Sequence, residues 1–195
     1  MKVNDFVVFA LNWAKGNIEE KQIQGSVVPS SRFLVKQMVK KGEIQNAQVI
    51  VEFWPGTWVF TEEIIKYLTP HIQLYIVEIN PSFCDFLKQK FPQFSENIYN
   101  IDVRDFQKVL ASKWISKIDL IISWLPFLSL PKEVFQSVFS SLLGKFWSEN
   151  TIFKQFSYGP SSKKYFPYVG EIQTSFCLFN LPPAFVFTMK WVKKI

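Results

Sequence analysis

Four short apolar runs rich in β-branched residues recur along the chain, and stretches with helical periodicity separate them. The runs are residues 48–54, 73–79, 97–102 and 118–124. Runs that are apolar on both faces are typical of parallel strands covered by helices on both sides. The alternation of strand and helix therefore predicts an open, doubly wound α/β sheet.

The stretches between the runs carry helix signals. Residues 61–68 start with a threonine and two glutamates, residues 81–91 open with a proline, and residues 131–145 are amphipathic and contain Gly144 near their end. These are the residue types found at helix starts and ends. Before the first strand, residues 30–41 are expected to form a helix capped by Ser30 or Ser31.

After Gly144 the pattern changes to strands without helices between them. Residues 151–158, 170–180 and 184–192 read as strands, and the last two are joined by the turn sequence LPPA. We expect a seven-stranded, mostly parallel, Rossmann-like sheet that ends in an antiparallel hairpin. The length of 195 residues fits one domain over residues 1–195, with an N-terminal helical arm at 1–45 and the sheet core at 46–195.

Composition excludes several kinds of site. The two cysteines are far apart in the sequence and His71 is the only histidine, so no metal site is expected and a Ser-His-Asp or Cys-His mechanism would depend on one residue. The apolar stretch 120–131 is too short to span a bilayer, and residues 1–16 do not resemble a signal peptide. We expect a reduced, cytoplasmic protein.

Acidic residues stand at the ends of three predicted parallel strands. Glu52, Glu78 and Asp102 close the first, second and third runs. Ligands of open α/β sheets bind beyond the carboxyl ends of the strands, and a carboxylate after the second strand is suited to accept both hydroxyls of a ribose. A carboxylate in this position also caps a helix in many proteins, so each acid taken alone has a purely structural explanation. Together they predict a nucleoside-binding site.

An ordered set of motifs resembles class I S-adenosylmethionine-dependent methyltransferases. These are VEFWPGTWVFTEEI, YIVEINPSF, NIDVRDF and DLIISWLPFLSLP. Within that class, GSVVPSSRFLVKQMV, SWLPFLSLP, FKQFSYGP and FNLPPAFVF resemble the bacterial phospholipid N-methyltransferases, and the likeness covers residues from about 24 to 190. It implies a Rossmann-like fold, S-adenosylmethionine as cofactor, and methyl transfer to the amino head group of phosphatidylethanolamine or its partly methylated forms.

The resemblance also implies roles for individual residues. Glu52 and the loop after it line the methionine side of the cofactor, Glu78 binds the ribose, Asp102 and Val103 flank the adenine, and Ser123 and Leu125 lie beside the reactive methyl group. The implied cofactor-binding residues are Glu52, Pro55, Gly56, Thr57, Glu78, Ile79, Asp102, Val103, Ser123 and Leu125. Tyr158 is the candidate catalytic residue that touches the amine, and a core tyrosine is the competing interpretation.

The charge of the chain agrees with a peripheral position on a membrane. A net charge of +6 favours anionic partners, although ordinary solvated lysines give the same balance. We expect a phospholipid substrate, an anionic membrane surface at the inner face of the cytoplasmic membrane, and no nucleic acid. A helix bearing Phe6 and Trp13 would lie in the membrane interface, or it would cover the sheet edge or cap the cofactor.

Two other functions stay open. The first is an rRNA adenine N6-dimethyltransferase, although such enzymes usually carry N-L-P-[YF] after the fourth strand, where Trp124 precedes Leu-Pro-Phe here. The second is a non-catalytic module with this fold whose cofactor pocket is filled by indoles.

Tryptophan occupies three positions where the family usually has glycine. These are Trp54, Trp58 and Trp124, and the chain contains seven tryptophans and only seven glycines. Glycines in such loops let the backbone approach the ligand and adopt positive φ. Either the loop has diverged, or UGA codons that the source organism reads as glycine are written here as tryptophan. UGG at these codons would exclude the second explanation.

Overall fold

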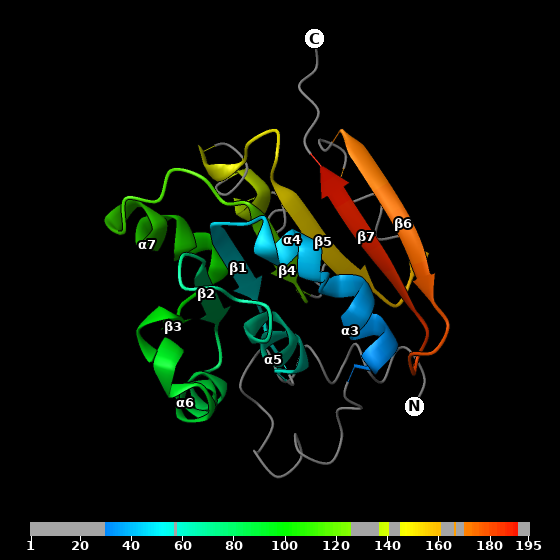
Figure 1. Cartoon of the computed structure of the whole chain (residues 1–195), viewed down its shortest axis with the longest axis horizontal. Coiled ribbons are helices and arrows are strands. Elements are labelled where there is room, and N and C mark those ends of the chain that lie inside the picture. Colours follow the sequence, from blue (N-terminus) through cyan, green and yellow to red (C-terminus); the bar gives the residue numbers. More distant parts are fainter. Residues whose placement is uncertain are drawn as a thin grey trace.

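The computed structural model describes residues 30–56, 58–125, 137–140, 145–160, 166 and 170–190. Its centre is a seven-stranded sheet in the order β3-β2-β1-β4-β5-β7-β6 (Figure 1). The strands are β1 (Val49–Phe53), β2 (Gln73–Glu78), β3 (Ile98–Asn100), β4 (Leu120–Ser123), β5 (Ile152–Ser157), β6 (Glu171–Cys177) and β7 (Ala184–Lys190).

Strands β1 to β5 are parallel, whereas β7 runs antiparallel to both β5 and β6. The predicted mostly parallel sheet with a terminal antiparallel hairpin is confirmed. Each of the predicted strands is present in the described residues, and most are shorter than predicted by one or two residues at an end. Residues 191 and 192 of the last predicted strand lie outside the described residues.

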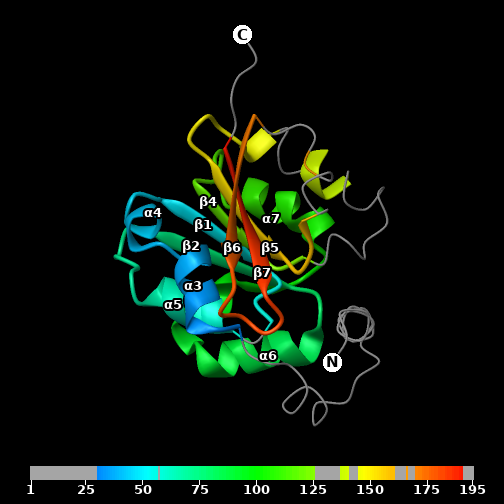
Figure 2. The same ribbon diagram turned by 90° about the vertical axis from the view of Figure 1, so that its right-hand side faces the viewer.

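Helices cover both faces of the sheet, as the apolar character of the strands on both sides requires. In Figure 2 the sheet is seen from its β6 edge, with α3 (Arg32–Met38), α4 (Lys41–Gln45) and α5 (Val59–Ile65) on one side and α7 (Phe106–Ser112) on the other. Helix α6 (Pro81–Lys90) completes the first layer. The short helices η1 (Pro92–Asn97) and η2 (Val103–Asp105) flank β3.

Strand alternation divides the core into two clusters. Odd-numbered residues of β1, such as Val51 and Phe53, pack with α7. Even-numbered Ile50 packs with helices α3 to α6. Glu52 therefore points to the face that α5 covers. The described part of the predicted arm, residues 30–45, packs against this same face, with Leu34, Met38 and Ile44 fully buried.

Two predicted helices begin or end differently from the sequence expectation. The helix expected over residues 30–41 is capped by Ser31, as one of the two alternatives had it, but it ends at Met38 because Val39 is extended, and α4 follows as a separate helix. The helix expected at Thr61 begins at Val59, after the cap residue Trp58. Thr61 therefore lies inside the helix, where its hydroxyl is free to bond a side chain.

Helix α6 begins as predicted. Pro81 occupies its first turn, and the Asn80 side chain accepts hydrogen bonds from the backbone N–H groups of Ser82 at 3.0 Å and Phe83 at 3.4 Å. Of the amphipathic stretch 131–145, only residues 137–140 and 145 are described, and they are helical. No described helix is long and apolar enough to cross a membrane.

Candidate functional site

Two buried carboxyl groups lie at the carboxyl edge of the sheet, on neighbouring strands. Glu52 is in β1 and Glu78 ends β2, and both belong to the set of alternate residues that faces α5. Glu52 is 1 % exposed and Glu78 is fully buried. Parallel pairing of β1 with β2 thus brings together two residues that are 26 positions apart in sequence, as the strand-end argument predicted.

Each of these carboxyl groups has one oxygen bonded and one free. The Thr61 hydroxyl donates to Oε2 of Glu52 at 2.7 Å, and the Asn80 backbone N–H donates to Oε1 of Glu78 at 2.8 Å. Oε1 of Glu52 and Oε2 of Glu78 have no hydrogen-bond partner among the described residues. Buried polar atoms are almost always paired in native proteins, so two orphaned acceptors at one edge point to a ligand that supplies donors.

Burial raises the pKa of both carboxyl groups to about 8. The negative charge of Glu78 raises the pKa of Glu52 further, while the bond from Thr61 opposes the shift. For Glu78 the opposing effect comes from the backbone N–H groups of Asn80 and Ile79. Strongly shifted, partly unsatisfied carboxyls are characteristic of binding sites.

The loop after β2 is held in place by Asn100 at the end of β3. The Asn100 side-chain amide donates to the carbonyl oxygens of both Glu78 and Ile79 at 3.0 Å. Ile79 itself is 38 % exposed at the sheet edge. A ligand bound to Glu78 would therefore meet a fixed loop with an accessible apolar side chain beside it.

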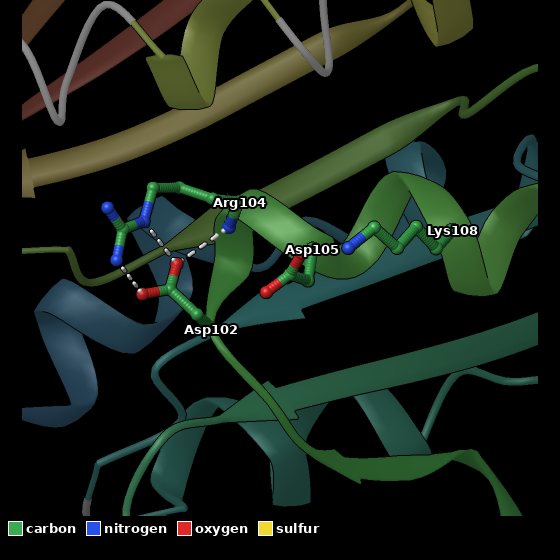
Figure 3. A network of polar contacts seen from close by, with 4 residues as sticks. All are labelled: Asp102, Arg104, Asp105 and Lys108. Carbon is green, nitrogen blue, oxygen red and sulfur yellow. Dashed lines mark hydrogen bonds and ion pairs between the residues drawn. The ribbon is translucent and has the colours of Figure 1, made fainter.

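Asp102 is engaged by a neighbour in this structure. Arg104 donates to it from Nε at 2.9 Å, from Nη2 at 2.7 Å and from its backbone N–H at 2.8 Å (Figure 3). These bonds hold the pKa of Asp102 below its usual range. Val103 follows as the first residue of η2. A ligand amino group near Asp102 would share the carboxylate with the Arg104 guanidinium, and the predicted adenine contact stays a prediction.

The loop after β1 has the backbone of a glycine loop. Trp54, Gly56 and Trp58 all have positive φ, at 56°, 54° and 54°. Such left-handed conformations are open to glycine and strained for a residue with a Cβ atom. Pro55 and Gly56 are buried, and Thr57 lies outside the described residues. The two tryptophans thus adopt the conformation of the residue that the family pattern has there.

The loop after β4 brings a third indole against this loop. The six-membered ring of Trp124 lies so close to Gly56 that a Cβ atom on the glycine would be 1.7 Å from the ring. The same indole stacks on Phe156, with ring centroids 5.7 Å apart. The space directly against Gly56, on the side where a Cβ would point, is therefore filled by Trp124.

Ser123 and Leu125 are buried on either side of Trp124. The Leu125 N–H donates to Oγ of Ser123 at 3.2 Å, and the Gln155 side-chain amide donates to the Leu125 carbonyl at 3.0 Å. Pro126 lies outside the described residues. This loop is thus tied to β5 and sits at the same edge as Glu52.

Tyr158 follows the last residue of β5, so it also lies at the carboxyl edge. Its hydroxyl is hydrogen-bonded to the Asn180 side chain in the turn between β6 and β7, and burial raises its pKa. Asn180 also accepts from the Ser31 backbone N–H at 2.8 Å and donates to the Pro182 carbonyl at 2.8 Å. Whether Tyr158 touches a substrate amine stays a prediction.

Three polar residues of the site escaped the sequence prediction. Thr61 supports Glu52, Gln155 fixes the loop after β4, and Asn180 joins Tyr158 to the start of α3. For Gln155 a signal existed, since a glutamine in the middle of a buried apolar strand needs partners. For the other two, the partners are distant in the sequence or on another element. Within the described residues, no group of three His, Cys, Asp or Glu side chains is placed to bind a metal ion.

Comparison with known families matches this chain to one family over most of its length. The family model described as ribosomal RNA adenine dimethylase matches residues 25–155. The chain belongs to the ribosomal RNA adenine dimethylase family. This family member is 28 % identical, over 172 residues, to an ornithine lipid N-methyltransferase from Singulisphaera acidiphila, and the match covers 87 % of this chain and 89 % of the relative.

Solved methyltransferase structures share the fold of this family member. An O-methyltransferase from Bacillus cereus in complex with SAH has a TM-score of 0.63 at 10 % identity, covering 97 % of this chain and 92 % of its own. The O-methyltransferase TomG from Streptomyces achromogenes in complex with SAM has a TM-score of 0.61 at 9 % identity, covering 98 % and 100 %. Family and fold together make the chain a class I methyltransferase.

Proposed function

We propose that this protein transfers a methyl group from S-adenosylmethionine to the amino head group of a phospholipid of the phosphatidylethanolamine type. The observation that carries the proposal is the pair of buried carboxyl groups at the ends of β1 and β2, each with an orphaned oxygen. The free oxygen of Glu78 is suited to accept hydroxyl groups of the cofactor ribose, and that of Glu52 is suited to groups on the methionine side. When bound, S-adenosylmethionine supplies an electrophilic methyl group on a sulfonium ion.

The fit to the cofactor differs between the two sides of the site. The acid side fits, because Glu52 and Glu78 present unpaired acceptors on fixed elements. The glycine-loop side does not fit in the tryptophan form, because the Trp124 ring fills the space against Gly56. Replacing these indoles with glycine would open that side. We therefore assign the methyltransferase activity to the open-loop form, in which glycine replaces Trp54, Trp58 and Trp124.

The residues around the substrate would act mainly by positioning. An amine attacks only in its neutral form, and holding it in line with the methyl group supplies most of the rate enhancement. Tyr158 is the candidate contact for the amine, with its hydroxyl held by Asn180. The buried loop of Ser123 and Leu125 would screen this point from water.

A lipid substrate is supported by the relative that matches nearly the whole chain. That relative is described as an ornithine lipid N-methyltransferase, so an amine-bearing lipid is the shared chemistry. The net charge of +6 agrees with peripheral binding to an anionic membrane at the cytoplasmic face. The residues invoked for this from the sequence, Phe6 and Trp13, lie outside the described residues.

A second candidate function is methylation of adenine in ribosomal RNA. The description of the matching family model favours it. In that case the same cofactor site would serve, and the basic surface would contact phosphates. A third candidate, a non-catalytic module, is favoured by the indole that lies against Gly56.

Calorimetric titration tests the cofactor assignment. S-adenosylmethionine is titrated into the protein as written and into the triple variant W54G/W58G/W124G, followed by methyl transfer to phosphatidylethanolamine vesicles and to an adenine-containing rRNA fragment. We expect binding by the triple variant and transfer to the lipid. Transfer to RNA alone would replace the lipid proposal, and absence of binding by both proteins would leave the non-catalytic module.

A further inference from the structure

Large exposed apolar side chains gather at one edge of the molecule. In the part of the chain that the structure describes, seven such side chains are exposed, and six lie at the carboxyl edge of the parallel strands. These six are Phe33, Ile79, Phe176, Leu178, Phe179 and Leu181. The seventh, Trp114, lies at the end of α7, at the opposite edge. Scattered apolar residues are ordinary on protein surfaces, whereas a contiguous group marks a binding surface.

Four of these residues form one patch, which we call the hairpin patch: Phe33, Leu178, Phe179 and Leu181. Phe176 pairs with Phe185, which packs on the α7 side of the sheet, so Phe176 lies on the face opposite α3. The ring centroids of Phe33 and Phe179 are 5.1 Å apart. The Ser31 backbone N–H donates a hydrogen bond to the side chain of Asn180, which lies between the exposed residues Phe179 and Leu181. Both views show the closed end of the β6–β7 hairpin beside the first turn of α3 (Figures 1 and 2).

Strand register places the hairpin patch beside the candidate site. Ser157 at the end of β5 pairs with Phe185 near the start of β7, so the turn before β7 lies beyond the carboxyl end of β5. Tyr158 continues from β5 into this region, and its hydroxyl is bonded to Asn180 in the same turn. A binding partner on the hairpin patch would therefore lie next to Tyr158, the residue proposed to contact the substrate amine.

The charges around the patch suit an anionic partner. Residues 172–189 contain no charged side chain. Helix α3 carries Arg32 in its first turn and Lys36 in its last turn, and it has no acidic residue. The Arg32 guanidinium lies over the Phe33 ring, 5.1 Å from its centre. Leucine and phenylalanine side chains flanked by basic residues are the combination that inserts at a bilayer surface while cations meet the lipid phosphates.

We propose that the hairpin patch docks the protein on an anionic lipid bilayer and presents the candidate site to the lipid head groups. This proposal rests on the proposed function, because a lipid amine held in a bilayer reaches the site only if this edge faces the membrane. The turn between β6 and β7 enters the interface, and Asn180 links its position to Tyr158.

The test is sedimentation with vesicles of phosphatidylethanolamine and phosphatidylglycerol. The double variant L178S/L181S changes two residues that are 62 % and 73 % exposed, so its fold is expected to be unaffected. We expect at least about tenfold weaker vesicle binding, from the apolar surface withheld from the bilayer. The control W114S removes an apolar side chain that is 93 % exposed at the opposite edge, and it is expected to bind as the parent does.

Equal vesicle binding by L178S/L181S and the parent would overturn the patch assignment. So would a triple variant W54G/W58G/W124G that fails to bind vesicles but methylates a short-chain phosphatidylethanolamine dispersed as monomers, and in that case the proposed function stands. Loss of self-association in L178S/L181S without loss of vesicle binding would show that a second copy of the chain covers the patch. Methylation of RNA without any vesicle binding would remove both proposals.

A second inference comes from backbone conformation alone. In the described part of the chain, three residues other than glycine have positive φ, and all three are tryptophan: Trp54, Trp58 and Trp114. Tryptophan is not among the residues that visit this conformation readily. Trp114 is the informative one, because it is 93 % exposed and lies far from the candidate site.

Trp114 stands at the glycine position of a helix C-terminus. Its N–H donates to the Ala111 carbonyl at 3.1 Å, and the next N–H, of Ile115, donates to the Leu110 carbonyl at 3.0 Å. This pair of bonds is the Schellman motif, in which the left-handed residue is usually glycine. Decay of a cofactor loop would not place tryptophan at a remote helix end.

We infer that positions 54, 58 and 114 are glycine in the functional protein, through a UGA codon that the source cell reads as glycine. Trp124 and Trp147 have no positive φ and stack on Phe156 and Phe153, so backbone conformation does not mark either of them as a further case. Sequencing the gene and identifying residues 54, 58 and 114 by tandem mass spectrometry of the native protein tests the inference. UGA codons and glycine at these three positions are expected; UGG codons or tryptophan in the native protein would overturn it.

Discussion

Replacing Trp114 with glycine should stabilise the protein. A residue with a Cβ atom loses roughly 1–2 kcal/mol in the left-handed conformation. Glycine removes that strain but makes the unfolded chain more flexible, which costs about 0.4–1 kcal/mol. Since Trp114 is 93 % exposed, little buried apolar surface is lost with the indole. The net gain in the free energy of unfolding is about 0.5–1 kcal/mol, or a rise in melting temperature of about 1–4 °C for a chain of this size.

Thermal unfolding followed by circular dichroism measures this gain, with two matched controls. W114A removes the indole but keeps a Cβ atom, so it should melt no higher than the parent. W114N should fall between them, because asparagine tolerates the left-handed region better than most residues. Equal stabilisation by W114A and W114G would show that loss of the exposed indole, and not relief of backbone strain, is responsible, and the reasoning would fail. Trp54 and Trp58 are poorer tests because their side chains pack against the core clusters.

Four further predictions concern buried polar groups. The pKa of Glu78 is raised to about 8 from 4.5, so between these values the folded state holds a proton that the unfolded state lacks. Stability should therefore fall as pH rises through this window. E78Q should reduce the slope of melting temperature against pH and leave the part that Glu52, with the same raised pKa, contributes. In calorimetry on the triple variant W54G/W58G/W124G, S-adenosylmethionine should bind more tightly as pH rises toward 8, because ionised Glu78 is the stronger hydrogen-bond acceptor. Adding E78Q to this variant should weaken binding about tenfold at high pH. An affinity that does not change with pH would contradict this role of Glu78. T61V strips Glu52 of its donor and should lose about 1–3 kcal/mol in urea unfolding, whereas no loss would mean that water replaces the hydroxyl. The Lys154 side chain is fully buried and forms an ion pair with Glu43 at 2.7 Å. E43A leaves this buried charge without its partner and should lower the free energy of unfolding by about 3 kcal/mol, whereas E43A/K154M should recover most of that loss. A double variant as unstable as E43A would show that the unpaired lysine is not the cause.

Local sequence patterns were sufficient for the architecture. β-Branched runs apolar on both faces predicted the parallel strands, Pro81 marked the start of α6, and the LPPA turn marked the terminal hairpin. Acids at strand ends predicted that Glu52 and Glu78 would meet. These predictions succeed because hydrophobic periodicity and the residues that start or end helices and turns are local properties of the sequence. Parallel strands also end at the same edge of a sheet, whatever their order in it.

The structure supplied what depends on residues far apart in the chain. The Thr61 hydroxyl reads as a helix cap in the sequence, yet it turns to Glu52 because the helix starts two residues earlier. No pattern in the sequence indicated that Arg104 would hydrogen-bond Asp102, or that Asn180 would bond both Ser31 and Tyr158. The exposure of Leu178, Phe179 and Leu181 could not be foreseen either, since an apolar turn is as easily buried as exposed.

The sequence by itself determined the doubly wound sheet, its antiparallel hairpin, and the position of the acids, because each follows from spacing along the chain. It also showed tryptophan where a glycine loop is expected. Only the tertiary structure decided that Trp54, Trp58 and Trp114 share a left-handed backbone, that Trp124 lies against Gly56, and that the apolar hairpin lies at the same edge as the acids. Backbone dihedrals and contacts between loops are set by the packing of distant elements, and no local pattern of residues encodes them.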